Sequence, residues 1–187
     1  MFIKNRVDIA IVKAIKSGGI GIIPTDTIYG IVGSALLRNT VKKIYELRKR
    51  NPRKPMVVLI GSVRDLNVFG VKPNLIVKKQ IRKLWPGEIS VILPCASKKF
   101  AYLHRGTKTI AFRLPANARL RKLLKKTGPL VAPSANMEGK PPARTISQAR
   151  AYFGDRVDFY LDVGRVFSRP SKLVKIKDGG RIEIIRK

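Results

Sequence analysis

The sequence predicts an α/β protein, classed as α+β in some schemes, in which helices flank both faces of one twisted, mixed β-sheet. Two observations carry this prediction. Helix-like and strand-like segments alternate along the 187 residues without a long linker, a repeat or a low-complexity stretch. Several successive strand-like segments also lie too close together for a crossover helix, which requires antiparallel pairs in the sheet. We therefore expect one domain over residues 1–187.

In the first third of the chain, apolar residues at helical spacing predict a helix over 5–16, stopped by Gly18–Gly19. A strand is expected at 19–23. A second helix, at 40–50, combines an Asn39–Thr40 cap with an apolar stripe. The compact apolar run 56–60 predicts the next strand.

In the remainder, Pro73 opens a helix over 73–84, because proline suits the first turn. Strands are expected at 89–93 and 109–114, followed by a basic helix at 115–126. The last elements predicted are a buried strand at 130–132, a short helix at 147–153, and closing strands at 159–163, 173–176 and 182–185.

The composition is strongly basic: 40 Lys and Arg against 11 Asp and Glu give a formal charge of +29. This excess favours a polyanionic partner such as tRNA or another RNA, or a nucleotide. A uniformly solvated basic surface explains it equally well. The single Cys95 forms no intramolecular disulfide, and no apolar run is long enough to span a membrane, so we expect a cytoplasmic protein without a membrane partner.

The segment Pro24–Gly30 reads P-T-D-T-I-Y-G and follows an apolar strand. Polar side chains at such a strand end commonly bind ligands in open α/β sheets, and glycine allows close approach of the backbone. An ordinary Asx or Ser/Thr turn explains the same residues.

A second segment, Arg48–Pro55, reads R-K-R-N-P-R-K-P and places basic residues at the end of one helix and in a rigid turn that contains two prolines. Arginines that donate two parallel hydrogen bonds, together with a mobile lysine, suit the binding of a triphosphate. Alternatively, the cations only interact with the dipole at the end of a helix, which explains Arg48–Arg50 but not Arg53 or Lys54. The single His104 and the scarcity of carboxylates disfavour a triad, a histidine metal site or a paired-carboxylate mechanism.

Taken in order, these and four further segments resemble the YrdC-type family, the threonylcarbamoyl-adenylate synthases, in its short single-domain form. The matching segments are P-T-D-T-I-Y-G (24–30), R-K-R-N-P-R-K-P-M (48–56), W-P-G-E-I-S (85–90), F-R-L-P (112–115), A-P-S-A-N-M-E-G-K-P (132–141) and P-S-K-L-V-K-I (170–176). The resemblance implies the YrdC-like three-layer fold.

The resemblance also implies a reaction. L-threonine and bicarbonate form a carbamate that attacks ATP, giving threonylcarbamoyl-AMP and pyrophosphate for a separate transferase that modifies tRNA next to the anticodon. Mg²⁺ is expected to arrive on the ATP phosphates. By matching positions, the threonine side comprises Thr25, Arg113, Ala132 and Ser171. The ATP side comprises Arg48, Arg50, Lys54, Thr109, Ser134, Asn136 and Arg186. No dedicated acid or base is implied; Arg48, Arg50 and Lys54 act electrostatically.

Several positions depart from the family pattern, among them Arg48 for Lys, Asn51 for Pro, Glu138 for Ser and Lys172 for Thr. These departures and the charge motivate an alternative, a non-catalytic RNA-binding protein with the same fold. A third reading is a carbamoyl-transfer role like that of related domains in hydrogenase maturation, which the absence of acylphosphatase-like and zinc-finger segments disfavours.

Overall fold

The computed structural model describes residues 1–187, apart from the side chain of Asp178. Its strands are β1 (Phe2–Lys4), β2 (Gly21–Pro24), β3 (Tyr29–Ser34), β4 (Val58–Leu59), β5 (Ile89–Pro94), β6 (Thr109–Arg113), β7 (Leu130–Val131), β8 (Phe159–Leu161), β9 (Lys172–Ile176) and β10 (Ile182–Arg186). Its α-helices are α1 (Ile9–Lys16), α2 (Arg38–Leu47), α3 (Leu75–Leu84), α4 (Ala101–His104), α5 (Ala118–Thr127) and α6 (Ile146–Phe153).

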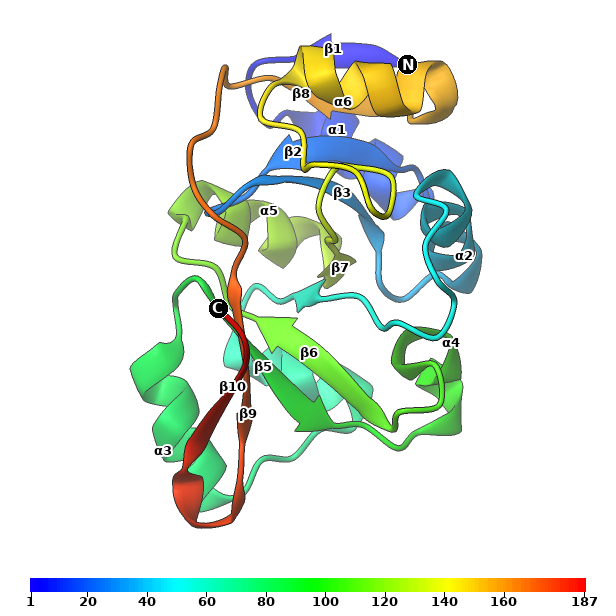
Figure 1. The fold of residues 1–187 in the computed structure, drawn as a ribbon. Coiled ribbons are helices and arrows are strands. Elements are labelled where there is room, and N and C mark those ends of the chain that lie inside the picture. The colour runs from blue at the N-terminus through cyan, green and yellow to red at the C-terminus, as the bar shows by residue number, and fades with distance from the viewer.

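The strands form one sheet in the order β1-β8-β2-β3-β7-β4-β6-β5-β9-β10 (Figure 1). The sheet contains parallel pairs such as β4 with β6 and antiparallel pairs such as β2 with β3. The sheet is therefore mixed, as the short connections predicted. Within the described residues, no helix has the length and apolar character needed to cross a bilayer.

Helices cover both faces of the sheet and bury two hydrophobic clusters. On one face, Ile11 and Ile15 of α1 and Leu120 and Leu124 of α5 pack over the centre of the sheet. On the other face, α2, α4 and α6 contribute to a larger cluster that includes Phe112 and the single tryptophan and cysteine. This arrangement confirms the fold class expected from the sequence.

All five helices predicted from the sequence begin one to four residues away from the expected position, and side-chain caps explain several of these starts. Asp8 caps α1 by accepting a hydrogen bond from the Ile11 N–H at 3.0 Å, so the helix starts at Ile9 rather than at residue 5. Helix α2 starts at Arg38 without a side-chain cap, and the Thr40 hydroxyl instead donates to the Gly18 carbonyl at 2.9 Å. Asn74, one residue after Pro73, caps α3.

The strand β3 was not predicted, although it is buried along its whole length. It pairs antiparallel with β2 and with β7, and an isolated bridge joins Gly30 to Ser134. The Ile31 N–H donates to the Pro133 carbonyl at 3.0 Å. Through β3, the P-T-D-T-I-Y-G segment therefore lies directly beside the A-P-S-A-N segment.

Candidate active site

The ends of β2, β6 and β7 enclose a cavity of about 330 Å³ near the middle of the sheet. Its polar lining combines hydroxyls with four arginines and, among the described residues, includes no carboxylate. The residues that line it are Thr25, Thr27, Ile28, Gly30, Arg48, Arg50, Pro55, Met56, Val57, Ile92, Thr107, Thr109, Ala111, Arg113, Ala132, Pro133, Ser134, Pro170, Ser171, Leu173 and Arg186. Such a lining favours small ligands that carry negative charge.

The turn between β2 and β3 places two threonines on the cavity wall. The Thr25 hydroxyl donates to the Ile28 carbonyl at 2.7 Å, and the Thr25 and Thr27 hydroxyl oxygens lie 3.0 Å apart. Gly30 allows close packing beside this turn, since a Cβ there would lie 3.3 Å from both the Thr25 methyl and the Pro133 carbonyl oxygen. The segment is thus a Ser/Thr turn and part of a cavity wall at once.

Arg113, at the end of β6, is 3% exposed and is held by the same turn. Its Nη1 donates to the Thr27 hydroxyl at 3.2 Å, and its Nη2 lies 3.1 Å from the Asp26 carboxylate. Burial lowers the pKa of Arg113, and the charge of Asp26 opposes that shift. The side chain therefore presents a fixed guanidinium to the cavity.

Arg48 follows α2 and is also 3% exposed. Its Nε donates to the Asn136 carbonyl at 3.0 Å, and its Nη2 donates to both the Ser134 hydroxyl and the Asn136 side-chain oxygen at 3.2 Å. Burial, more than the neighbouring Arg50, lowers the pKa of Arg48 to about 10, which leaves it charged at neutral pH. Arg48 thus fixes the position of Ser134 on the cavity wall.

Arg50 and Lys54 lie in the turn that follows. Arg50 lines the cavity, and its guanidinium donates to the backbone carbonyls of Lys54 and Pro55 at 3.1 and 2.9 Å. The Lys54 ammonium is exposed and pairs with Glu138 at 2.7 Å. This pair lowers the pKa of Glu138. Lys54 is therefore not directed into the cavity.

Ser171 and Arg186 meet at the side of the cavity nearest to β9. The Arg186 Nη2 donates to the Ser171 carbonyl at 2.8 Å, and the Ser171 hydroxyl lies 3.1 Å from that of the buried Ser90. The sequence assigned Ser171 to threonine and Arg186 to ATP. Their contact shows that a residue predicted to bind threonine lies next to one predicted to bind ATP.

The structure gathers nine of the eleven predicted site residues around the cavity: Thr25, Arg48, Arg50, Thr109, Arg113, Ala132, Ser134, Ser171 and Arg186. Lys54 and Asn136 do not line it; Asn136 is buried and braces Arg48. Which ligand each residue binds stays a prediction. Thr107 lies outside every segment predicted to form the site, whereas Thr27 belongs to the P-T-D-T-I-Y-G segment expected at a ligand site but was assigned to neither substrate.

The fold and cavity define the chain as an α/β protein with a preformed, arginine-rich site for small anionic ligands. A family model named Sua5_yciO_yrdC, described as "Telomere recombination", matches residues 13–187. The chain belongs to this family.

Individual relatives agree with the family match. The chain is 32% identical over 163 residues to a protein of Mycobacterium tuberculosis named putative threonylcarbamoyl-AMP synthase, covering 86% of this chain and 74% of that protein. It is 31% identical over 171 residues to the threonylcarbamoyl-AMP synthase of Marinobacter nauticus, covering 89% of this chain and 90% of that protein.

Among solved structures, P. abyssi Sua5 complexed with L-threonine superposes with a TM-score of 0.88 at 26% identity. All of this chain is covered, but it spans only 57% of the P. abyssi chain. The E. coli YciO structure, with a TM-score of 0.84 at 18% identity over 94% of that chain, is similar in fold.

Proposed function

We propose that the chain is an L-threonylcarbamoyladenylate synthase, a nucleotidyltransferase that converts L-threonine, bicarbonate and ATP into threonylcarbamoyl-AMP, pyrophosphate and water. The observation that carries this proposal is the single cavity in which Thr25, Arg113 and Ser171 meet Arg48, Arg50 and Ser134. The names of the relatives support it over the alternative of a non-catalytic RNA-binding protein.

In this proposal, Arg113 binds the threonine carboxylate, and the Thr25 turn contacts the amino acid. The threonine amine combines with bicarbonate to form a carbamate, and water is lost. A carbamate oxygen then attacks the α-phosphorus of ATP, the bond from that phosphorus to the bridging oxygen breaks, and pyrophosphate leaves. Holding the reactants in line accounts for about 7–11 kcal/mol of barrier lowering in favourable cases. The carbamate is anionic already, so a strong general base is unnecessary.

On the nucleotide side, Arg50 contacts the phosphates and Arg48 keeps Ser134 in place for the nucleotide. Preformed cations of this kind stabilise the charge that develops on the leaving pyrophosphate. Magnesium enters as part of the substrate, MgATP. The product passes to a tRNA threonylcarbamoyl transferase, and the basic surface contacts tRNA or another RNA. Synthesis of the product and its transfer to tRNA both take place in the cytoplasm.

The test measures pyrophosphate release with ATP alone, with ATP and threonine, and with both plus bicarbonate, together with identification of the product by mass spectrometry. Arg113→Ala removes the positive charge proposed to bind the carboxylate, so we expect the threonine KM to rise on the order of 10- to 100-fold while the ATP KM changes little. Arg119→Ala, on the exposed surface of α5, is the matched control. Pyrophosphate release no greater than with ATP alone would contradict the proposal.

A melting curve gives an independent check. If both substrates occupy one cavity, MgATP and threonine together should raise Tm by more than the sum of their separate effects. Strictly additive shifts would indicate separate sites.

A further inference from the structure

Asp26 is a buried carboxylate that stands behind the cavity wall rather than on it. Its side chain is 5% exposed, yet it does not belong to the cavity lining, whereas its neighbours Thr25 and Thr27 do. One carboxylate oxygen accepts the Ala116 N–H at 2.9 Å, and the other lies 3.1 Å from the Arg113 Nη2. Asp26 therefore ties the turn after β2 to the connection between β6 and α5.

The contacts of Arg113 leave one specific group free. Nη1 donates a hydrogen bond to Thr27, and Nη2 forms an ion pair with an Asp26 oxygen that, within the described residues, accepts no hydrogen bond. The Arg113 Nε–H is buried and has no hydrogen-bond partner in the part of the chain that the structure describes. A buried donor without a partner is unfavourable by about 1–3 kcal/mol, so the contacts with Asp26 and Thr27 must hold the guanidinium in place against this cost.

We propose that Asp26 is the positioning residue that orients Arg113 toward the carboxylate of the amino-acid substrate and makes the site select a carboxylate over a neutral amide. This inference rests on the proposed function, because it takes an amino acid as the substrate. Asp26 acts through Arg113 and does not contact the substrate.

The position of Asp26 suits both parts of this role. A carboxylate on the cavity wall would repel the substrate carboxylate, whereas one behind the guanidinium is separated from it by the positive charge. Burial alone disfavours the charged form of Arg113, and the Asp26 charge offsets this effect. A paired guanidinium is also confined to one orientation before the substrate arrives.

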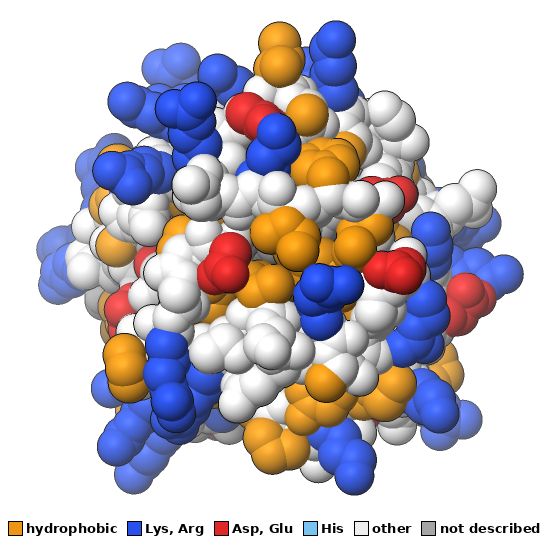
Figure 2. Space-filling view, turned by 90° about the horizontal axis from the view of Figure 1, so that it is seen from above, with side chains coloured by type: hydrophobic (Ala, Val, Ile, Leu, Met, Phe, Trp, Pro, Cys, Tyr) orange, Lys and Arg blue, Asp and Glu red, His pale blue; other side chains and the backbone are white. Residues whose placement is uncertain are grey.

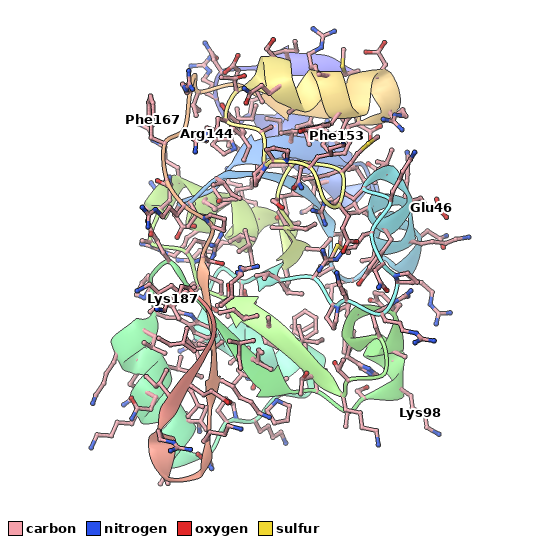
Figure 3. The ribbon with its side chains drawn as sticks, in the orientation of Figure 1. Glu46, Lys98, Arg144, Phe153, Phe167 and Lys187 are labelled. Atoms are coloured by element: carbon pink, nitrogen blue, oxygen red, sulfur yellow. The ribbon has the colours of Figure 1, made fainter. Side chains whose placement is uncertain are left out.

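The experiment compares the wild-type chain with Asp26→Asn and Asp26→Glu. Asn keeps an acceptor for the Ala116 N–H but removes the charge that holds Arg113. In Asp26→Asn we expect the threonine KM to rise about tenfold or more, the ATP KM to change by less than about twofold, and kcat to change little. Glu46→Gln, on the outer face of α2 where its side chain points away from the sheet (Figure 3), is the control for loss of one negative charge.

A second readout is the affinity for L-threonine relative to L-threoninamide, measured by calorimetry below the Tm of each variant. We expect Asp26→Asn to lower this ratio about tenfold, and Asp26→Glu, which restores the charge, to stay within about threefold of the wild type. If Asp26→Asn does not fold, Asp26→Glu still tests the inference. A fall of about tenfold in the ratio of L-threonine to L-threoninamide affinity in Asp26→Glu would contradict it, because this variant keeps the charge.

Equal losses of threonine and ATP affinity in Asp26→Asn would assign Asp26 a purely structural role and overturn the inference alone. A wild-type chain that binds no L-threonine would overturn the proposed function as well.

Discussion

Gly21 shows how a single residue sets the spacing of the sheet next to the site. It lies on β2 between β3 and β8, and a Cβ at this position would come within 2.3–2.5 Å of the Phe159 ring. Phe159 is fully buried and stacks on Phe2 with ring centroids 5.8 Å apart. The ring cannot move aside without disturbing this packing, so the close approach requires glycine.

Gly21→Ala should therefore destabilise the fold. Overpacking of this kind typically lowers the free energy of unfolding by about 1–3 kcal/mol, and for a chain of this size we expect Tm to fall by roughly 3–10 °C. The measurement is thermal unfolding of Gly21→Ala in the wild-type background and in a Phe159→Leu background. The loss should be clearly smaller when the ring is absent, because the two residues are in contact. An equal loss in both backgrounds would refute the packing explanation.

At the same scale, the sequence predicted which segments carry the site but not every side chain that faces it. Arg113 and Ser134, which were assigned from the family resemblance, both line the cavity. Lys54 does not, since its direction depends on Glu138, which lies 84 residues further along the chain. Pairing across such a separation leaves no local pattern in the sequence.

At the scale of elements, the turn after α2 and the loop after β7 are linked beside the cavity. Glu138 joins them: its N–H donates to the Arg48 carbonyl at 2.8 Å, and its carboxylate pairs with Lys54 and accepts the Asn51 N–H. Arg48 adds three further hydrogen bonds between the same two segments. The turn after α2 and the loop after β7 thus form one unit.

Glu138→Gln tests this connection through its pH dependence. Lys54, and then the Asn51 N–H, lower the pKa of Glu138 below its ordinary value of 4.5. A lowered pKa contributes stability above the ordinary value, and this contribution is lost as pH falls through the lowered pKa. We expect Glu138→Gln to melt about 1–3 °C below the wild type at pH 7, because Lys54 is largely exposed and the pair is worth about 1 kcal/mol or less.

That difference should disappear in acid, below about the lowered pKa, when the wild-type carboxylate is also neutral. The matched control is Glu46→Gln, whose partner Lys42 lies 3.8 Å away with both side chains well exposed; no measurable change is expected. A Glu138→Gln deficit that stays constant from pH 7 into acid would show that the carboxylate charge does not join the segments.

The elements themselves were predicted to different degrees. Helices such as α5 and α6 follow from apolar periodicity, and their boundaries differ from expectation by a few residues at most. Strands β1 and β3 were missed for different reasons. β1 is three residues long and is held by pairing with β8, more than 150 residues away, while β3 carries two glycines that weaken the strand signal.

The whole molecule carries far more positive than negative charge. Figure 2 shows Lys and Arg gathered around much of the rim of one face, whereas its centre is mostly hydrophobic or uncharged and carries a few charged side chains of both signs. Lys98, near α4, also extends away from the ribbon (Figure 3). The sequence established the net charge of +29 but not this distribution, which depends on how the helices are placed around the sheet.

Such an excess of one sign destabilises the compact state by repulsion, and salt reduces this repulsion. Raising NaCl from about 20 to about 300 mM shortens the Debye length from roughly 20 to roughly 6 Å, so the free chain should melt at a higher temperature. The additional Tm increase that MgATP produces should become smaller over the same range, since salt also screens the arginines of the cavity from the phosphates.

The opposite signs of these two effects separate repulsion within the chain from attraction of the ligand. Thermal unfolding at several salt concentrations, with and without MgATP, measures both in one series. A Tm of the free chain that falls with NaCl would mean that favourable ion pairs, such as Lys177 with Glu183 at 3.0 Å, outweigh the net repulsion. An unchanged MgATP effect would mean that contacts other than charge dominate nucleotide binding, which would remove the electrostatic role assigned to Arg48 and Arg50.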